Sequence, residues 1–294
     1  MKRFDIAIAL PPDYRRQDAF AFHGRDAEGL AERIEGQRIR KGVMVDGMPA
    51  LLAIDLGAQP DQALCTVDID SRELPAAVKD MLLNMLGLRI DPAPFEAIAA
   101  GDPLFAPLVQ RERGLRVIQS ASIFEALSWA IIGQQINLGF AISLRRTFIS
   151  LAGRAHPDGL WCYPEAIDAA RLDLDQLTGR KFSRAKAETL LRLARLAADG
   201  ELDLERDADP GAVSERLLAV KGIGPWTVNY ALLRGYGFPD CSLEGDVAVR
   251  TAIGRLLGAE RPNLPAAAAF LQAYRPHRTM AAAHLWASLS QPAG

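Results

Sequence analysis

Residues 217–227 read Leu-Leu-Ala-Val-Lys-Gly-Ile-Gly-Pro-Trp-Thr, an apolar helix end followed by a turn with two glycines and a second helix start. Gly222 and Gly224 can take backbone angles that are closed to other residues. Pro225 suits a first helical position, because the N–H that proline lacks has no partner within the helix there. The stretch therefore predicts a helix–hairpin–helix.

The start of the second helix is a predicted anion site. Its first amides have no partner inside the helix, and the positive end of the helix dipole lies behind them. Backbone amides read the position of a phosphate and not the base sequence, so the hairpin predicts binding to a nucleic-acid backbone. An ordinary helical hairpin closed by a glycine cap has the same turn, and the turn alone does not separate the two.

Asp246 begins a further predicted helix over residues 246–257, after a loop that follows Phe238. In a first helical turn the dipole favours an ionised carboxylate. Acidic residues at this position commonly serve as helix caps. The residue pattern leaves Asp246 as either a cap or a catalytic carboxylate.

The motif Gly222-x-Gly224-Pro225, with Asp246 downstream, resembles the helix–hairpin–helix Gly/Pro/Asp superfamily of DNA glycosylases. The run from Gly222 to Tyr230, with Leu233-Arg234-Gly235 after it, is similar to the bacterial 3-methyladenine-DNA glycosylase II branch. Further similar segments are 124–127, 131–135, 184–188 and 284–286. The resemblance covers residues 90–290 closely and the first 90 residues loosely.

The resemblance implies a monofunctional DNA glycosylase that flips alkylated bases of the 3-methyladenine type out of duplex DNA and hydrolyses the N-glycosidic bond. It gives Asp246 the role of the catalytic carboxylate, which stabilises the positive charge that develops on the sugar. A lyase needs a lysine to form a Schiff base. At the matching position, two residues after Gly224, this chain has Trp226, so we expect no lyase activity.

The resemblance also assigns residues to the flipped base and to the DNA. Aromatic faces attract electron-poor alkylated purines, and Trp226, Tyr230 and Trp286 stand at the pocket positions, although aromatic residues on helices are more often core residues. Gln135 stands where relatives often have a leucine wedge that fills the gap in the duplex, although a polar residue at a helix end gives the same pattern. The expected DNA contacts in the hairpin are Lys221, Gly222, Ile223, Gly224 and Thr227.

Three residues depart from the pattern of the family. Pro225 replaces a basic residue that is frequent in the hairpin, Gly245 stands where a further acid can occur, and Val247 stands where an aromatic residue can occur. A smaller aromatic wall leaves the range of lesions open, and it does not change the expected reaction.

The predicted fold is an α+β N-terminal module followed by a mainly all-α helix–hairpin–helix glycosylase domain. Residues 1–90 alternate with a period of two, which predicts a small antiparallel sheet covered by a helix at 73–88. Asp91-Pro92-Ala93-Pro94 predicts a boundary, and the resemblance implies two helical subdomains in residues 91–294 with the active-site cleft between them. The expected helices are 122–135, 138–151, 164–170, 184–198, 212–220, 225–236, 246–257, 266–274 and 276–289.

Composition restricts the means of binding DNA and of catalysis. A net charge of −2 excludes a uniformly basic DNA-coating protein, so binding would rest on a local patch. The candidate patch, which could equally be the solvated face of a helix, is Arg180, Lys181, Arg184, Lys186, Arg192 and Arg195. Three separated cysteines cannot hold a four-thiolate iron–sulfur cluster. We expect no cofactor, and the resemblance adds only a monovalent cation that bridges hairpin carbonyls and phosphate.

The expected partner is double-stranded DNA with damaged bases. No apolar run reaches 18 residues, so we expect a soluble, cytoplasmic protein. We also expect a monomer. Two alternatives remain: a non-catalytic helix–hairpin–helix module that only binds duplex DNA, and a glycosylase for oxidised or deaminated bases. The first would need neither Asp246 nor a pocket at Trp286, and the missing lysine disfavours an oxidised-guanine enzyme.

Overall fold

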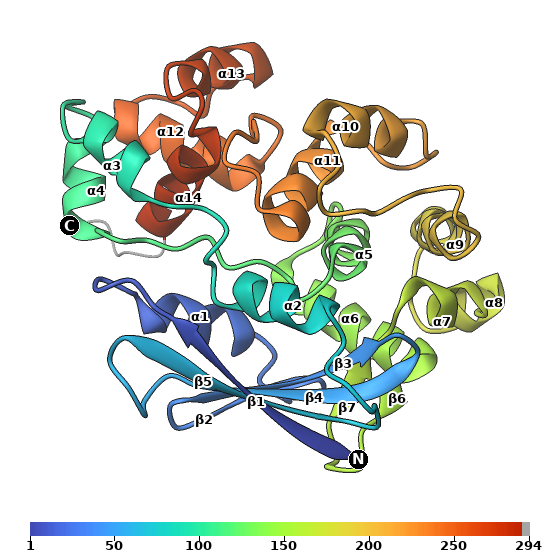
Figure 1. Ribbon diagram of the computed structural model, residues 1–294. Helices are drawn as coiled ribbons and strands as arrows, with labels where there is room; N and C mark the ends of the chain where they lie inside the picture. Colours follow the sequence, from blue (N-terminus) through green and yellow to red (C-terminus); the bar gives the residue numbers. More distant parts are fainter. Residues whose placement is uncertain (290–294) are drawn as a thin grey trace.

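The computed structural model describes residues 1–289. It combines one mixed β-sheet, built mostly from the first 70 residues, with a larger layer of helices above it (Figure 1). The expected sheet module and the expected mostly helical remainder are both present.

The strands of the sheet follow the order β1-β5-β4-β3-β7-β6, and β2 pairs with β3. The period-two segments of the sequence form β1, β3, β4 and β5, as predicted, and α1 (Arg16–His23) and α2 (Ala77–Met85) cover the face that is directed toward the other helices (Figure 1). The strands are β1 (Lys2–Ala9), β2 (Glu32–Glu35), β3 (Arg38–Val45), β4 (Met48–Asp55), β5 (Gln62–Ile69), β6 (Arg154–Ala155) and β7 (Trp161–Tyr163).

The strands of residues 1–90 pair antiparallel with one another, as predicted. Two short strands, β6 and β7, extend this sheet and correct the expectation that residues 91–294 are all-α. β7 lies parallel to β3, with Gly42 opposite Cys162 and Val43 opposite Tyr163. A side chain at Gly42 would overlap the carbonyl of Trp161, so glycine is needed for this approach. Strands of two and three residues are too short to show a period in the sequence. The boundary at 91–94 stays a prediction.

The remaining helices pack in two groups. One group surrounds α5 and contains α6 to α11, and the other contains α3, α4 and α12 to α14. The helices are α3 (Ala93–Ala99), α4 (Ala106–Arg111), α5 (Ile123–Gly133), α6 (Leu138–Ala152), α7 (Ala166–Ala170), α8 (Leu174–Thr178), α9 (Arg184–Ala198), α10 (Pro210–Leu218), α11 (Pro225–Ala231), the π-helix η1 (Leu232–Tyr236), α12 (Val247–Leu257), α13 (Leu264–Gln272) and α14 (Arg278–Leu289).

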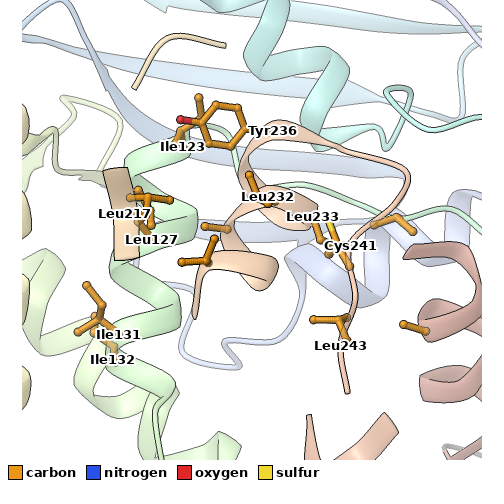
Figure 2. Close-up of a cluster of buried hydrophobic side chains, with 14 of the residues drawn as sticks. Ile123, Leu127, Ile131, Ile132, Leu217, Leu232, Leu233, Tyr236, Cys241 and Leu243 are labelled. Atoms are coloured by element: carbon orange, nitrogen blue, oxygen red, sulfur yellow. The ribbon is translucent and has the colours of Figure 1, made fainter. Parts of the chain in front are cut away.

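Helix α5 forms the centre of the larger hydrophobic core. Figure 2 shows Ile123, Leu127 and Ile131 of α5 in the same cluster as Leu217 of α10 and Leu232 of η1. Each fully buried Leu or Ile contributes roughly 1.5–3 kcal/mol relative to an exposed one. This packing fixes the end of α5 against the two helices that flank the hairpin.

A buried cluster of charges joins the sheet to α5 and α6. The Nζ atom of Lys41, on β3, lies 2.8 Å from a carboxylate oxygen of Glu32 and 2.7 Å from one of Glu125. Arg145 of α6 lies 3.1 Å from Glu32 and 3.0 Å from Glu125. Burial alone would raise the pKa of both carboxyls, but Lys41 and Arg145 together hold them below their ordinary values. The cluster fixes α5 relative to the sheet.

Candidate active site and DNA interface

The predicted helix–hairpin–helix is formed by α10, a turn and α11. Gly222 has a φ of +97°, and a side chain there would overlap Thr189 of α9. Gly224 caps α11, and Pro225 is its first residue. Ile223 is buried and anchors the turn in the core, while Lys221 is exposed. The turn therefore has the form that the glycines and the proline predict.

Thr227 differs from the expectation of a DNA contact. It is only 2% exposed, and its hydroxyl accepts a hydrogen bond from Nε2 of Gln134 at 2.9 Å. The same Gln134 nitrogen donates to the carbonyl of Gly222 at 3.3 Å. The side chain of Thr227 joins the hairpin to the end of α5 and is not available to phosphate.

Gln135, the wedge candidate, lies in the loop between α5 and α6. It is exposed and has a φ of +57°, a left-handed conformation that is unusual for a residue other than glycine. The loop and the hairpin line one cleft together, through residues 133–137 of the loop and through Gly222 and residues 224–227 of the hairpin. The structure thus brings the wedge candidate and the hairpin to one opening.

Asp246 is both a helix cap and part of this opening. Its Oδ1 accepts from the amide of Val249 at 2.9 Å and from Nε1 of Trp286 at 3.2 Å, and its Oδ2 accepts from Nε1 of Trp226 at 3.0 Å. Within residues 1–289 it forms no ion pair. Three neutral N–H groups therefore fix the carboxylate. No cationic side chain among residues 1–289 forms an ion pair with it.

The cleft beside Asp246 has a volume of ≈ 750 Å³. Its walls come from the loop after α5, from the hairpin and from the start of α12, so both helix groups contribute. Trp226, Asp246 and Val247 are among the lining residues. A cleft of this size can hold a base or a sugar, and a negatively charged side chain in its wall can act on the bound group.

Two of the three expected aromatic residues, Trp226 and Trp286, bond to Asp246, and the third, Tyr230, packs against Trp226. The ring centroids of Trp226 and Tyr230 are 5.3 Å apart, and Trp286 donates to Asp246. Tyr230 and Trp286 are half-buried and do not line the cleft itself. The hydroxyl of Tyr230 accepts from Nε1 of Trp129 at 2.9 Å, which gives the aromatic cluster a further member.

Sequence reasoning missed several residues of this region. Arg234 lies with Cζ 5.5 Å from the ring centroid of Trp286, and Arg25 lies with Cζ 5.3 Å from that of Trp129. Burial lowers the pKa of Arg234. Arg25 follows α1, so only the fold brings it here, whereas Gln134 stands in the motif 131–135 and could have been found there.

The residues of the predicted basic patch do not all face the solvent, because α9 turns some of them inward. Arg180, Lys181 and Arg184 are exposed, but Lys186 points inward and is only 8% exposed. The prediction that Lys186 belongs to an exposed basic patch is therefore wrong, because the helical period turns its side chain away from the solvent. Arg192 donates to the carbonyl of Lys221 at 2.9 Å and so supports the hairpin turn.

The three cysteines are buried at separate places, and burial raises the pKa of Cys65 and Cys241 to about 12 and that of Cys162 to about 11. Within residues 1–289, no three His, Cys, Asp or Glu side chains gather in a way that could hold a metal ion. Over the same range, no helix has both the length and the apolar surface to cross a membrane.

Known proteins of similar sequence are DNA glycosylases. The chain is 30% identical over 270 residues to the DNA-3-methyladenine glycosylase of Bacillus subtilis (strain 168), with 87% of each chain covered. It is 27% identical over 175 residues to DNA-3-methyladenine glycosylase 2 of Escherichia coli (strain K12), which covers 59% of this chain and 60% of that protein. No protein-family model matches the chain.

Solved structures share the fold. A 3-methyladenine DNA-glycosylase from Archaeoglobus fulgidus matches with a TM-score of 0.83 at 22% identity, over 96% of this chain and 97% of that one. A Clostridium acetobutylicum 8-oxoguanine glycosylase/lyase in complex with double-stranded DNA matches with a TM-score of 0.73 at 15% identity, over 94% and 92%. The fold thus recurs in glycosylases for different lesions. The sequence likeness to the Bacillus subtilis protein, over most of both chains, shows that this chain belongs to the helix–hairpin–helix DNA-3-methyladenine glycosylase family.

Proposed function

We propose that the protein is a monofunctional DNA glycosylase of base excision repair, which removes alkylated bases of the 3-methyladenine type from double-stranded DNA. One observation carries the proposal. The Asp246 carboxylate lies in the wall of a cleft beside the hairpin, and among residues 1–289 only neutral N–H groups hold it. The names of its sequence relatives support the choice of alkylated bases.

The hairpin and the loop after α5 would act before the chemistry. An enzyme that works on a base inside a duplex must extrude the nucleotide, at a cost of a few kcal/mol. The turn at Gly222 and Gly224 would hold the backbone through its amides, and the exposed Lys221 would add a positive charge. The exposed Gln135 would fill the space that the base leaves and bond to the orphaned partner base.

Asp246 would then act on the sugar. As the N-glycosidic bond breaks, its electron pair leaves with the base, and C1′ of the sugar takes on positive charge. A fixed carboxylate stabilises this charge without reorganisation. Water attacks C1′ and loses its proton, which restores the sugar as an abasic site. A cationic alkylated base leaves as a neutral molecule, so the lesion itself eases the bond cleavage.

The residues at the hairpin favour hydrolysis without lyase chemistry. A Schiff base needs a lysine that reaches C1′, and Trp226 occupies the position that a lyase lysine would take. Lys221 is exposed in the turn, and the carbonyl before Gly222 is held by Arg192. Treatment with borohydride should therefore trap no covalent complex between the protein and damaged DNA; a trapped complex would contradict this part of the proposal.

The proposed setting is a monomer that acts on chromosomal DNA in the cytoplasm. Structural neighbours include a Schizosaccharomyces pombe 3-methyladenine DNA glycosylase in complex with abasic DNA, which supports a DNA partner. A monovalent cation at the hairpin stays a prediction. The carbonyls of Lys221 and Gly222 already accept from Arg192 and Gln134, which leaves each one further lone pair.

The test is to incubate the protein with methylated duplex DNA and to identify the released free bases by chromatography. Asp246→Asn is the matched variant, because asparagine caps a helix about as well as aspartate. We expect base release to fall by about 10²–10³-fold with DNA binding largely kept. Equal release by the variant would remove Asp246 from catalysis, and tight duplex binding without any release by the wild-type protein would favour the non-catalytic alternative. Duplexes with oxidised or deaminated bases test the other alternative in the same assay.

A further inference from the structure

Lys186 is a buried lysine that meets no carboxylate within residues 1–289. Its Nζ donates to the carbonyl of Ile132 at 2.5 Å and to that of Gln134 at 3.0 Å. Burial lowers its pKa. Burying an ammonium group without a counter-ion costs free energy, and its hydrogen bonds offset only part of that cost. We therefore ask what the two bonds of Lys186 stabilise.

Both acceptors belong to the end of α5, where the last carbonyls have no partner within the helix. A positive charge at this end also interacts favourably with the helix dipole. The residue that follows is Gln135, the wedge candidate. Its left-handed backbone costs roughly 1–2 kcal/mol in a residue other than glycine. Such a conformation persists only when its surroundings hold it.

The same face of α9 also holds the hairpin. Thr189 packs against Gly222, and Arg192 bonds to the carbonyl of Lys221. Because Lys186, Thr189 and Arg192 are spaced by three residues, they lie near one another along α9. One helix therefore supports both the hairpin and the loop that carries Gln135, and Lys186 supplies its hydrogen bonds to the start of that loop.

We propose that Lys186 is a positioning residue, which holds the α5–α6 loop so that Gln135 can enter the duplex when a base is extruded. This inference rests on the proposed function, because it assumes that a base leaves the duplex. It assigns Lys186 no contact with DNA or with the lesion. Its loss should therefore impair insertion into paired DNA and leave the chemistry of an already extruded base intact.

The test compares Lys186→Met with Lys79→Met, a matched control that removes an exposed lysine on the far helix α2. Each protein receives the same lesion in a paired duplex and in an unpaired bulge. Because the variant removes two hydrogen bonds from a charged group to the end of α5, we expect excision from the paired duplex to fall by about tenfold or more. Excision from the bulge should stay at the wild-type rate, and the control should match the wild type on both.

A fluorescent base analogue, 2-aminopurine beside the lesion, reports insertion without any need for excision. Lys186→Met should lower its fluorescence rise on binding. In the background of Gln135→Ala, the same substitution should have no further effect on the ratio of paired to bulge excision, because both substitutions disable the same insertion step. If Lys186→Met proves unstable at the assay temperature, Lys186→Gln keeps a donor and should show a smaller effect of the same kind.

Three outcomes would overturn the inference. The two substrates could lose excision by the same factor, the double variant could show fully additive losses, or the wild-type protein could give no fluorescence rise. Failure of the proposed function would give another result. The wild-type protein would then unstack the analogue but release no base, and the fluorescence would still measure the effect of Lys186 on insertion.

Discussion

Glu125 and Asp246 are two carboxylates at the starts of helices, and they are held in opposite ways. Glu125 of α5 is 4% exposed and meets Lys41 and Arg145. Asp246, the cap of α12, is half-buried beside a cleft, and its hydrogen-bond donors in the described part of the chain are the N–H groups of Val249, Trp226 and Trp286. The first negative charge is neutralised inside the protein, and the second is oriented but not neutralised.

The difference is the one that we expect between a structural carboxylate and the catalytic carboxylate that we propose for Asp246. Ion pairs with Lys41 and Arg145 lower the pKa of Glu125 in spite of its burial, so its charge has partners and cannot serve a substrate. Neutral dipoles fix a carboxylate while its field still extends into the cleft. A cap and a catalytic group are thus compatible roles, and Asp246 fills the first in this structure in a way that suits the second.

The largest expected effect concerns the neutralised side of the comparison. Lys41→Met removes a cation that bridges Glu32 and Glu125 and leaves them with Arg145 and with His23 beside Glu32. Removal of one partner from a buried ion cluster costs about 3–5 kcal/mol. Urea denaturation should therefore show a free energy of unfolding lower by this amount. A loss no larger than that for Lys79→Met, an exposed lysine, would mean that the cluster contributes little to holding α5.

A smaller effect concerns the orientation of Asp246. Trp286→Phe removes the N–H that lies 3.2 Å from Oδ1 and keeps an aromatic ring. Because hydrogen bonds to charged groups are worth about 1.5–3 kcal/mol, we expect single-turnover base release to slow by about tenfold. Trp129→Phe is the control, since its N–H bonds to Tyr230 instead. A faster rate in Trp286→Phe would show that this N–H weakens the charge more than it positions it.

The smallest expected effect concerns a buried imidazole outside both carboxylate sites. His284 of α14 stacks on Phe95 with ring centroids 5.3 Å apart, and its two ring nitrogens bond to nothing within residues 1–289. Burial and then Arg15 lower its pKa to about 4. The unfolded chain takes up a proton near pH 6.5 and the folded one does not, so stability is complete above that pH and is lost as pH falls toward 4.

Thermal or urea unfolding at pH 8 and pH 6 measures this contribution. The wild-type protein should lose about 1 kcal/mol more than His284→Leu between the two values. Equal losses would show that the imidazole is hydrated or paired when folded. The leucine variant should also be at least as stable as the wild type at pH 8, because it removes unsatisfied buried polar atoms.

The hairpin and Asp246 could be predicted because their signals are local. Gly222, Gly224 and Pro225 determine the backbone of the turn by themselves, and the helix start at Asp246 follows from the pattern after it. The aromatic residues Trp226, Tyr230 and Trp286 came from the family resemblance. The fold places Trp226 and Trp286 against Asp246 and Tyr230 against Trp226. Their individual roles stay predictions.

Other parts depend on contacts that no local pattern contains. Lys186 belonged to a basic run in the sequence, and only the packing of α9 against α5 shows that it points inward. Arg25 and Trp129 meet although they are distant in the sequence. The strand β7 has only three residues, and it forms through its parallel pairing with β3. The end of the predicted helix 225–236 is a π-helix, η1, whose wider turn is not visible in residue spacing.

The most direct test exchanges the two carboxylates for their amides, as Asp246→Asn and Glu125→Gln, and measures both base release and unfolding. The account predicts that Asp246→Asn lowers single-turnover release by about 10²–10³-fold and leaves the free energy of unfolding within about 0.5 kcal/mol of wild type. Glu125→Gln should lose stability, and its folded fraction should release base at the wild-type rate. An Asp246→Asn protein that keeps the wild-type rate, or that loses rate only as far as it unfolds, would contradict the account.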